Sequence, residues 1–324
     1  PYVSEIYKIN VLRVRAFKAG FVPSETVTRS YMIDPAGATL YSMPIVSMVC
    51  DSSDLYAGAT GIYKFGDHPE GNYAQKGVAW ERMAYMDYFD QTGTLGFQRD
   101  VRVRIHGGGS RHAPKKTFRI YAEVDTFKNF KYQFFEHYDV TKFKRILLRT
   151  GGHRLDCFPR DNLANFITEG LNVDQQHYDH VIVFLNGEYW GIQSIKERVD
   201  KYFLQNHYEI DDDEITILDQ EYDLQGGGHS ADSLEMVAIE TRADTSDMTD
   251  PANYYWIEER IDIDNYIDYM AGEIFLSNQD WVYSNVVLWK KTGGYDPTLG
   301  PGQDGKFRWC YYDFDGAFGG SCDN

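Results

Sequence analysis

The sequence predicts an α+β fold in which an antiparallel sheet is combined with a helical part. Alternating apolar and polar residues indicate strands in the first half of the chain, for example DVRVRIH at 100–106. Asn186-Gly187 separates two apolar runs, which is a strong signal for a β-hairpin. In 261–277, apolar residues recur at helical spacing and predict a buried amphipathic helix that ends before Asn278.

Each predicted strand is a short alternating or apolar run bounded by turn residues. Residues 1–33 hold two of them, NVLRVRAFKAG and PSETVTRSYMI, separated by a turn at Gly20–Pro23. The other strands outside the hairpin are IVSMV, ERMAYMDYFD, DVRVRIH, KKTFRIYAEV, FKRILLRTG, NVVLWKK and FRWCYYD.

Helices are predicted at three further places. FPRDNLANFITEGL is expected to be a helix with Pro159 in its first turn. The hairpin around Asn186 runs into a short helix, with Glu197 at the junction. Residues 219–253 are expected to form an acidic, Gly-rich loop around one short helical run. For the amphipathic helix in 261–277, we expect the buried side chains to be Ile263, Tyr266, Ile267, Met270, Ile274 and Phe275.

Composition limits the class of protein. The 324 residues are 43% hydrophobic and 25% charged, which is ordinary for a soluble globular protein. Apolar runs stay well short of the length that a membrane span needs. The net charge of −17 argues against nucleic acid as a partner, because phosphate binding needs a basic face. The four cysteines lack zinc-type spacing; Cys310 and Cys322 could form a bridge, but the sequence leaves the pairing open.

Three polar residues near the end of the sequence stand in an order that suggests phosphoryl transfer. Asp280 and Asn285 lie in SNQDWVYSNVVLWKK, and Asp313 opens the turn DFDG. Protein kinases present an Asp that accepts the proton of the acceptor hydroxyl, followed by an Asn and a second Asp that hold Mg²⁺. Each residue alone is also a common turn former or helix cap, so the order of the three carries the prediction.

Asp280 and Asn285 can share a ligand only in a loop. On a continued helix their side chains would point about 140° apart, at roughly 100° per residue. If NVVLWKK and FRWCYYD pair as an antiparallel hairpin with Lys291 opposite Phe307, then Asn285 lies directly opposite Asp313. Two oxygen ligands for a hard cation would then meet at the open end of the hairpin.

A Gly-rich segment, GGGSRHAP at 107–114, precedes two lysines and could wrap phosphates. The cations there are Arg111, Lys115 and Lys116. Alternation puts Lys116 on the face of Phe118, so its ammonium group needs an anionic partner or a ligand. The alternative interpretation is a flexible hairpin with solvated lysines. Glu197 could brace a phosphate-binding lysine, or could equally be a first-turn Glu favoured by the helix dipole.

Five blocks of sequence carry a resemblance to a known family. They are VRIHGGGSRHAPKKTFRIYA, LLRTGGHRLDCFPRDNLANFI, VFLNGEYWGIQSIKERVDKYF, IDIDNYIDYMAGEIFLSNQDWVYSNVVLWK and FRWCYYDFDGAFG. Together they resemble the spore coat protein H (CotH) family of atypical, secreted protein kinases, from about Val46 to Gly319. Residues 1–33 resemble the close of a chitobiase-type β-sandwich module. We therefore expect a kinase-like domain over 34–324, with further elements missing beyond the DFDG turn.

The resemblance implies an atypical protein-kinase-like fold of reduced architecture and transfer of phosphate from ATP to a protein Ser or Thr, with Mg²⁺ or Mn²⁺. Asp280 would be the catalytic Asp, Asn285 and Asp313 would bind the metal, and Asp315 would assist or replace Asp313. By the same resemblance, the cations facing the phosphates would be Arg111, Lys115 and Lys116, and Glu197 would be the bracing acid. The chain departs from the family pattern at Ser284-Asn285, where Asn-Asn is usual, and at the Gly-rich turn. The expected location is secreted or on a bacterial cell surface, with ATP and a protein substrate as partners.

Two other functions compete with the kinase. One is a catalytically silent member of the family that serves as a surface or adhesion module. The other is a polysaccharide hydrolase with paired carboxylates, such as Asp280 with Asp313 or Glu197. A kinase differs from both in that Mg-ATP should stabilise it against unfolding.

Overall fold

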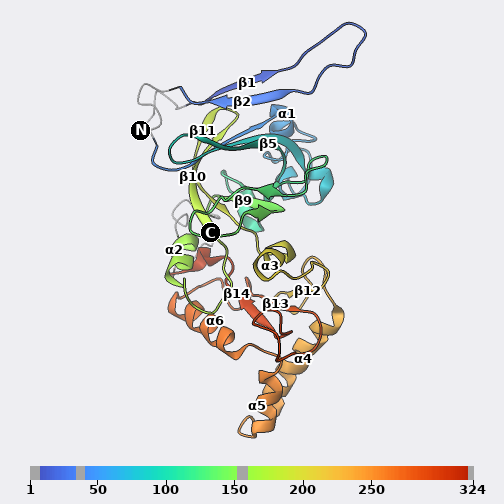
Figure 1. The fold of residues 1–324 in the computed structure, drawn as a ribbon, viewed down its shortest axis with the longest axis vertical. Helices are drawn as coiled ribbons and strands as arrows, with labels where there is room; N and C mark the ends of the chain where they lie inside the picture. The colour runs from blue at the N-terminus through green and yellow to red at the C-terminus, as the bar shows by residue number, and fades with distance from the viewer. Residues whose placement is uncertain (1–7, 34–40, 152–159, 320–324) are drawn as a thin grey trace. The chain divides into compact units, whose positions relative to one another are not determined.

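The protein consists of two compact units, which are described separately (Figure 1). The computed structural model describes residues 8–33, 41–151 and 160–319. Unit 1 contains Pro1–His153 and Tyr178–Lys196, and unit 2 contains Arg154–His177 and Glu197–Asn324. Each unit therefore combines two segments of the chain.

Unit 1 is built around a closed barrel of seven strands in the order β10-β11-β9-β6-β5-β4-β3. Strands β10 and β3 pair in parallel, and all other neighbours in the barrel are antiparallel. The strands are β3 (Ile45–Cys50), β4 (Arg82–Phe89), β5 (Leu95–His106), β6 (Thr117–Tyr121), β9 (Arg145–Arg149), β10 (Tyr178–Leu185) and β11 (Glu188–Lys196). The sequence predicted these strands and the α+β class. It did not predict the closure, because local patterns contain no information on the pairing of β3 with β10.

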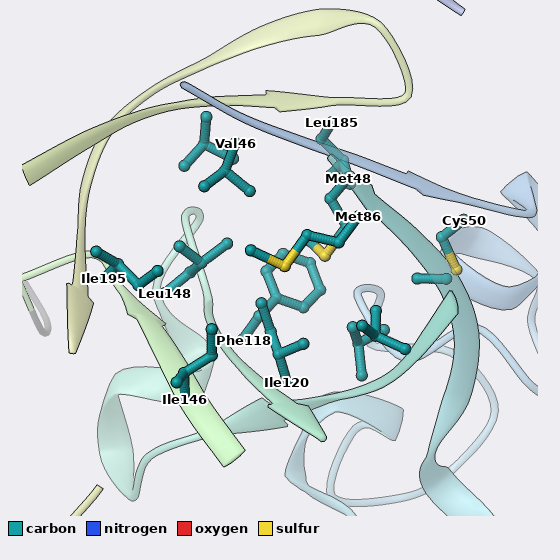
Figure 2. Close-up of a cluster of buried hydrophobic side chains, with 14 of the residues drawn as sticks. Val46, Met48, Cys50, Met86, Phe118, Ile120, Ile146, Leu148, Leu185 and Ile195 are labelled. Carbon is teal, nitrogen blue, oxygen red and sulfur yellow. The ribbon is translucent and has the colours of Figure 1, made fainter. Parts of the chain in front are cut away.

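Alternation along the strands fills the barrel with apolar side chains. In β5, Val101, Val103 and Ile105 are buried, whereas the residues between them are partly exposed. Figure 2 shows inward-pointing side chains from several strands, among them Val46, Met48, Met86, Phe118, Ile120, Ile146, Leu148, Leu185 and Ile195. Burial of each large apolar side chain contributes roughly 1.5–3 kcal/mol, so this core is a main source of stability in unit 1.

The predicted hairpin at Asn186-Gly187 is confirmed. Asn186 has a φ of 51° and Gly187 a φ of 84°, the pair of left-handed conformations that a two-residue hairpin turn requires. The backbone N–H of Cys50 donates to Asn186 Oδ1 at 2.8 Å, which ties the turn to the end of β3.

Shorter elements complete unit 1. The two strands predicted in residues 1–33 are present as β1 (Asn10–Val14) and β2 (Val27–Tyr31), which pair antiparallel in a separate sheet. Their relation to a chitobiase-type module stays a prediction. The remaining elements are β7 (Phe130–Lys131), β8 (Lys142–Phe143), α1 (Ser52–Tyr56) and the 3₁₀ turns η2 (Asn72–Ala74), η3 (Val78–Trp80) and η4 (Gly109–His112).

Unit 2 combines a three-stranded antiparallel sheet with helices. The sheet has the order β12 (Ile215–Leu218), β13 (Val287–Lys291), β14 (Arg308–Cys310). The helices are α2 (Arg160–Ile167), α3 (Lys201–Tyr208), α4 (Ser230–Thr245), α5 (Pro251–Glu258) and α6 (Ile263–Phe275), and η6 (Phe314–Gly316) follows β14. Both faces of the sheet are covered: Leu288 packs in one apolar cluster, and its neighbour Trp289 packs in another.

The prediction for residues 219–253 was wrong in part. The short helical run is α4, a helix of 16 residues, and α5 begins at Pro251 with Asp250 as its N-cap. Along α4, the weaker helix formers Ser, Asp and Thr are interspersed with strong helix formers such as Ala, Leu and Met, so the segment is helical.

The predicted helix in 261–277 is confirmed as α6, but its predicted buried face was wrong. Ile267, Ile274 and Phe275 are 57%, 65% and 76% exposed. The buried face contains Asn265 and Tyr269. Asn265 accepts the N–H of Trp309 at 2.6 Å and donates to its carbonyl at 3.2 Å, so a polar side chain joins α6 to β14 and decides which face is buried.

Two of the cysteines are described. Cys50 and Cys310 are buried free thiols. Cys157 and Cys322 lie outside the described residues, as does the predicted first-turn Pro159.

Candidate active site

Helix α6 is followed by a loop that begins at Asn278. Ser277 has a φ of 49°, which turns the backbone away from the helix. Asn278 is buried; its Nδ2 donates to Glu273 Oε2 at 2.9 Å, and its Oδ1 accepts the N–H of Asp280 at 3.3 Å. The loop is therefore anchored to the last turn of α6. The prediction that Asp280 and Asn285 lie in a loop, and not on a continued helix, is confirmed.

The anchor residue Glu273 is a titratable group. It is 1% exposed, and burial raises its pKa to about 7, although the hydrogen bond from Asn278 acts in the opposite direction. Tyr269 and Tyr311 also face it. Its Oε1 has no hydrogen-bond partner within the described part of the chain. Around neutral pH, this carboxyl group therefore changes its charge beneath the loop.

Asp280 and Asn285 lie in direct contact. Asn285 Nδ2 donates to Asp280 Oδ2 at 2.7 Å, and Ser284 Oγ donates to Asp280 Oδ1 at 2.7 Å. Asn285 has a φ of 60°, a left-handed conformation that Asn tolerates better than most residues. Each carboxylate oxygen of Asp280 thus accepts one hydrogen bond from its own loop, which fixes the orientation of the carboxylate.

The DFDG turn packs against this loop. The N–H of Gln279 donates to the carbonyl of Gly316 at 2.9 Å. A Cβ at Gly316 would lie 2.8 Å from Asn278 Oδ1 and 2.9 Å from the backbone nitrogen of Asp280, so only glycine fits here without displacement. The N–H of Phe314 donates to Asp161 Oδ1 at 3.1 Å, which holds the turn on α2. Asp313 and Asp315 are carried by this turn.

The strand register that was predicted to place Asn285 opposite Asp313 is wrong by one residue. Strands β13 and β14 pair antiparallel as expected, but Val287 pairs with Cys310 and Trp289 with Arg308. The ladder ends before Asn285 and Asp313, and both of these residues have left-handed φ angles, so the alternation rule for strands does not apply to them. The turn and the loop meet through Gly316 and not through a strand pair.

The oxygen atoms offered here suit a hard cation. Because Asn285 directs Nδ2 at Asp280, its Oδ1 is the atom left to act as a ligand. Asp313 is half-buried and Asp315 is buried, and both carry carboxylate oxygens. A set of one amide oxygen and two carboxylates is typical of Mg²⁺ and Mn²⁺ sites and unlike the sulfur and imidazole sets of softer ions. The residues present therefore fit a magnesium-type ion.

The basic residues Arg111 and Lys116 both lie in unit 1. Lys116 points inward as predicted, but its partners are not anions. Its Nζ donates to the carbonyls of Arg111 at 2.6 Å and Ala113 at 2.9 Å, and lies 4.0 Å from the ring centroid of Tyr73. Burial lowers the pKa of Lys116 to about 8. The guanidinium of Arg111 donates to backbone carbonyls of Gly107, Tyr73, Ala74 and Gln75.

Lys115 differs from these two residues. It is half-buried, and no ion pair among residues 8–33, 41–151 and 160–319 involves it. Of the three predicted phosphate-binding cations, Lys115 is the one whose charged group is not committed to carbonyl groups of its own unit.

Glu197 is buried between two histidines of unit 2. His207 Nε2 lies 3.1 Å and 3.2 Å from its two carboxylate oxygens, and His177 Nδ1 lies 3.0 Å from Oε2. Burial alone would raise the pKa of Glu197, but hydrogen bonds from His177 and His207 outweigh it and lower the pKa to about 2. For His207, burial lowers the pKa, and the hydrogen bond to and charge of Glu197 raise it above the ordinary value. The proposed pairing of Glu197 with a phosphate-binding lysine stays a prediction.

Sequence reasoning missed several of these residues. Asn278 and Ser284 flank Asp280 within a few positions, and a polar residue two before or four after a loop Asp is a readable signal for such support. His177 and His207 are far from each other in sequence, and only the fold of unit 2 brings them to Glu197. No local pattern indicates that cluster.

Comparison with known proteins yields one family. The model of a protein family described as "CotH kinase protein" matches residues 103–324, which is more than half of the chain. This match begins within β5, later than the expected start near Val46. No curated protein matches the chain. None of the described helices is long and apolar enough to cross a membrane. Family membership suggests kinase activity and the use of ATP. The chain belongs to the CotH kinase protein family.

Proposed function

We propose that this chain is an atypical protein kinase that transfers the γ-phosphoryl group of ATP to Ser or Thr of a protein, with a kinase-like fold and a location outside the cell or on its surface. The observation that supports it most is the direct contact of Asp280 with Asn285, at 2.7 Å, beside the DFDG turn. This is the trio of side chains whose order in the sequence resembles that of a kinase.

Asp280 is the residue that we propose to accept the proton of the acceptor hydroxyl. Its carboxylate accepts one hydrogen bond on each oxygen, from Ser284 and Asn285. A carboxylate has about four lone-pair positions, so each oxygen retains the capacity to accept a further proton donor. The two existing bonds restrict rotation of the carboxylate, which holds the remaining lone pairs in a fixed direction. Positioning of this kind is how a catalytic base gains efficiency.

Asn285, Asp313 and Asp315 would hold Mg²⁺ or Mn²⁺. When bound, such an ion neutralises charge on the nucleotide phosphates. The left-handed backbone at Asn285 and Asp313 sets the direction of these two side chains, and the bond from Phe314 to Asp161 keeps the turn in place. The predicted phosphate-binding roles of Arg111, Lys115 and Lys116 belong to the same proposal.

A cavity beside the loop supports a protein acceptor. It has a volume of about 380 Å³ and is lined mainly by apolar side chains, including Tyr222, Tyr269, Trp281, Val282 and Val286. Trp281 and Val282 directly follow Asp280. An apolar residue close to the phosphorylated hydroxyl of a polypeptide would fit such a cavity better than a polar sugar would.

The test is incubation of the purified chain with radiolabelled ATP and either Mg²⁺ or Mn²⁺, followed by mass spectrometry of modified sites. We expect phosphate on Ser or Thr of the chain itself or of an added protein. In Asp280→Asn, transfer should be lost, whereas Asp244→Asn, an exposed carboxylate of α4 in the same unit, should behave as wild type. Absence of both transfer and stabilisation by Mg-ATP would indicate a silent member of the family. Cleavage of a polysaccharide without nucleotide would indicate the hydrolase.

A further inference from the structure

A second cluster of ligand-type side chains lies in unit 2, formed by His177, Glu197 and His207. Within the described part of the chain, the ligand atoms of these three residues lie within 4.8 Å of one another. This set of ligand side chains differs in type from that of Asp280, Asn285 and the DFDG turn, because two of its three members are histidines. We propose that this cluster is a binding site for a Zn²⁺-type divalent ion, independent of the proposed kinase activity.

The separations of the donor atoms support coordination. Ligand bonds of about 2.0–2.2 Å in a tetrahedral zinc site place neighbouring donor atoms about 3.3–3.5 Å apart. Glu197 Oε2 lies 3.0 Å from His177 Nδ1 and 3.2 Å from His207 Nε2. Both imidazoles therefore place a nitrogen close to the same carboxylate oxygen, and a small outward movement of each ring would admit an ion between them.

The three residues come from three different segments of the chain. His177 precedes β10, Glu197 follows β11, and the N–H of Glu197 donates to the carbonyl of His177 at 2.9 Å. His207 lies on α3, where Phe203, one turn earlier, packs on its ring with a centroid separation of 4.2 Å. A backbone hydrogen bond and a ring contact thus hold the site, and the backbone N–H of His177 also donates to Glu197 Oε2 at 3.1 Å.

The three ligand residues differ in the exposed fraction of their side chains. The side chain of Glu197 is 3% exposed, whereas those of His177 and His207 are 14% and 18% exposed. A buried carboxylate needs a positive partner. The imidazole rings are partly exposed, whereas His177 Nδ1 itself is buried, so an ion reaches the carboxylate only when the rings move.

The chemistry of the donors selects the ion. Two imidazoles and one carboxylate suit Zn²⁺ and related first-row ions, and they suit Mg²⁺ poorly, since Mg²⁺ prefers oxygen ligands only. A metal bound here would engage Glu197 fully, so that this carboxylate could not also brace a phosphate-binding lysine. The two roles of Glu197 exclude each other, which makes the proposal testable against the sequence-based one.

The test is calorimetric titration of the metal-free full chain with Zn²⁺. We expect one site per chain, and its affinity should fall by no less than about tenfold in His177→Gln and in His207→Gln, because loss even of an outer partner costs about 10–100-fold. His229→Gln removes an exposed histidine of the same unit and should leave the site unchanged. Co²⁺ provides a second measurement, since its visible absorption reports ligand geometry directly.

Several outcomes would overturn the proposal. One is no Zn²⁺ binding by the wild-type chain, and another is equal affinity in wild type, His177→Gln and His207→Gln. The His→Gln variants are preferred to changes at Glu197, because substitution of this buried residue endangers folding. A melting curve then checks that the His→Gln variants fold. Mg-ATP binding is measured on the same samples: if it persists when Zn²⁺ binding is lost, the metal site and the proposed kinase function are separate, as we infer.

Discussion

The close packing of Gly316 against the Asp280 loop predicts a strong effect of a single added methyl group. In Gly316→Ala the new Cβ would lie 2.8 Å from Asn278 Oδ1, 2.9 Å from Asp280 N and 3.1 Å from Asp280 Cβ. Ordinary contact begins at 3.4 Å, and one of the atoms in the way is backbone, so the loop must retreat by about half an ångström in a densely packed region. Overpacking of this size costs about 1–3 kcal/mol of unfolding free energy.

The displacement should also reduce catalysis if Asp280 acts as proposed. Misplacement of a catalytic group by about 1 Å can cost 10²-fold in rate, so we expect phosphoryl transfer to fall by roughly 10- to 100-fold. Gly300→Ala is the matched control, because a Cβ there meets nothing within 4 Å and its φ is not left-handed. Denaturant unfolding and a radiolabel transfer assay measure the two effects. Equal stability and activity in both variants would refute the packing argument; lost stability with full activity would refute the role of the loop.

Four further variants test other contacts. Because burial raises the pKa of Glu273 from 4.5 to about 7, the folded state binds this proton more tightly than the unfolded state, and the stability present below pH 4.5 is lost as pH rises to 7. Glu273→Gln should remove about 2–3 kcal/mol of that pH dependence, as measured by urea unfolding at pH 5 and 7.5; an unchanged slope would contradict it. Lys116→Met should destabilise unit 1 by about 1–3 kcal/mol, because two carbonyls lose their donor. Lys115→Met should leave stability unchanged but weaken Mg-ATP binding, and the reverse pattern would show that the lysine roles are exchanged. Asp280→Asn should lower transfer by about 10²–10⁴-fold and retain stabilisation by Mg-ATP, as followed by thermal melting; loss of nucleotide binding would place Asp280 among the metal ligands.

The sequence was informative wherever a local pattern determines a structure. Alternation located the barrel strands, and Asn186-Gly187 located a hairpin, because both signals depend on neighbouring residues only. Helical spacing located α6 but gave the wrong buried face, since Asn265 is drawn inward by hydrogen bonds to Trp309, a residue far away in sequence. The spacing of apolar residues such as Ile274 and Phe275 contains no information on this long-range contact.

In the candidate site, too, local features were predicted correctly and contacts between distant residues were not. The loop position of Asp280 and Asn285 followed from helix geometry and is confirmed. The one-residue error in the β13–β14 register arose from assuming that the strands run unbroken to Asn285 and Asp313, where the left-handed backbone ends the alternation. The inward position of Lys116 was predicted correctly. The expectation that its ammonium group needs an anionic partner or a ligand did not consider backbone carbonyls; the carbonyls of Arg111 and Ala113 and the ring of Tyr73 contact this group.

The parallel pairing of β10 with β3 has a consequence for how much of the chain folds by itself. The family match starts at Val103, yet the barrel strands β3 and β4 and most of β5 come from residues before it. A fragment trimmed to the matched region would leave β10 without β3 and the remaining residues of β5 without β4, and such unpaired backbone N–H and C=O groups promote aggregation. A fragment that contains the whole barrel must therefore begin before Ile45 and extend to Lys196, the last residue of β11.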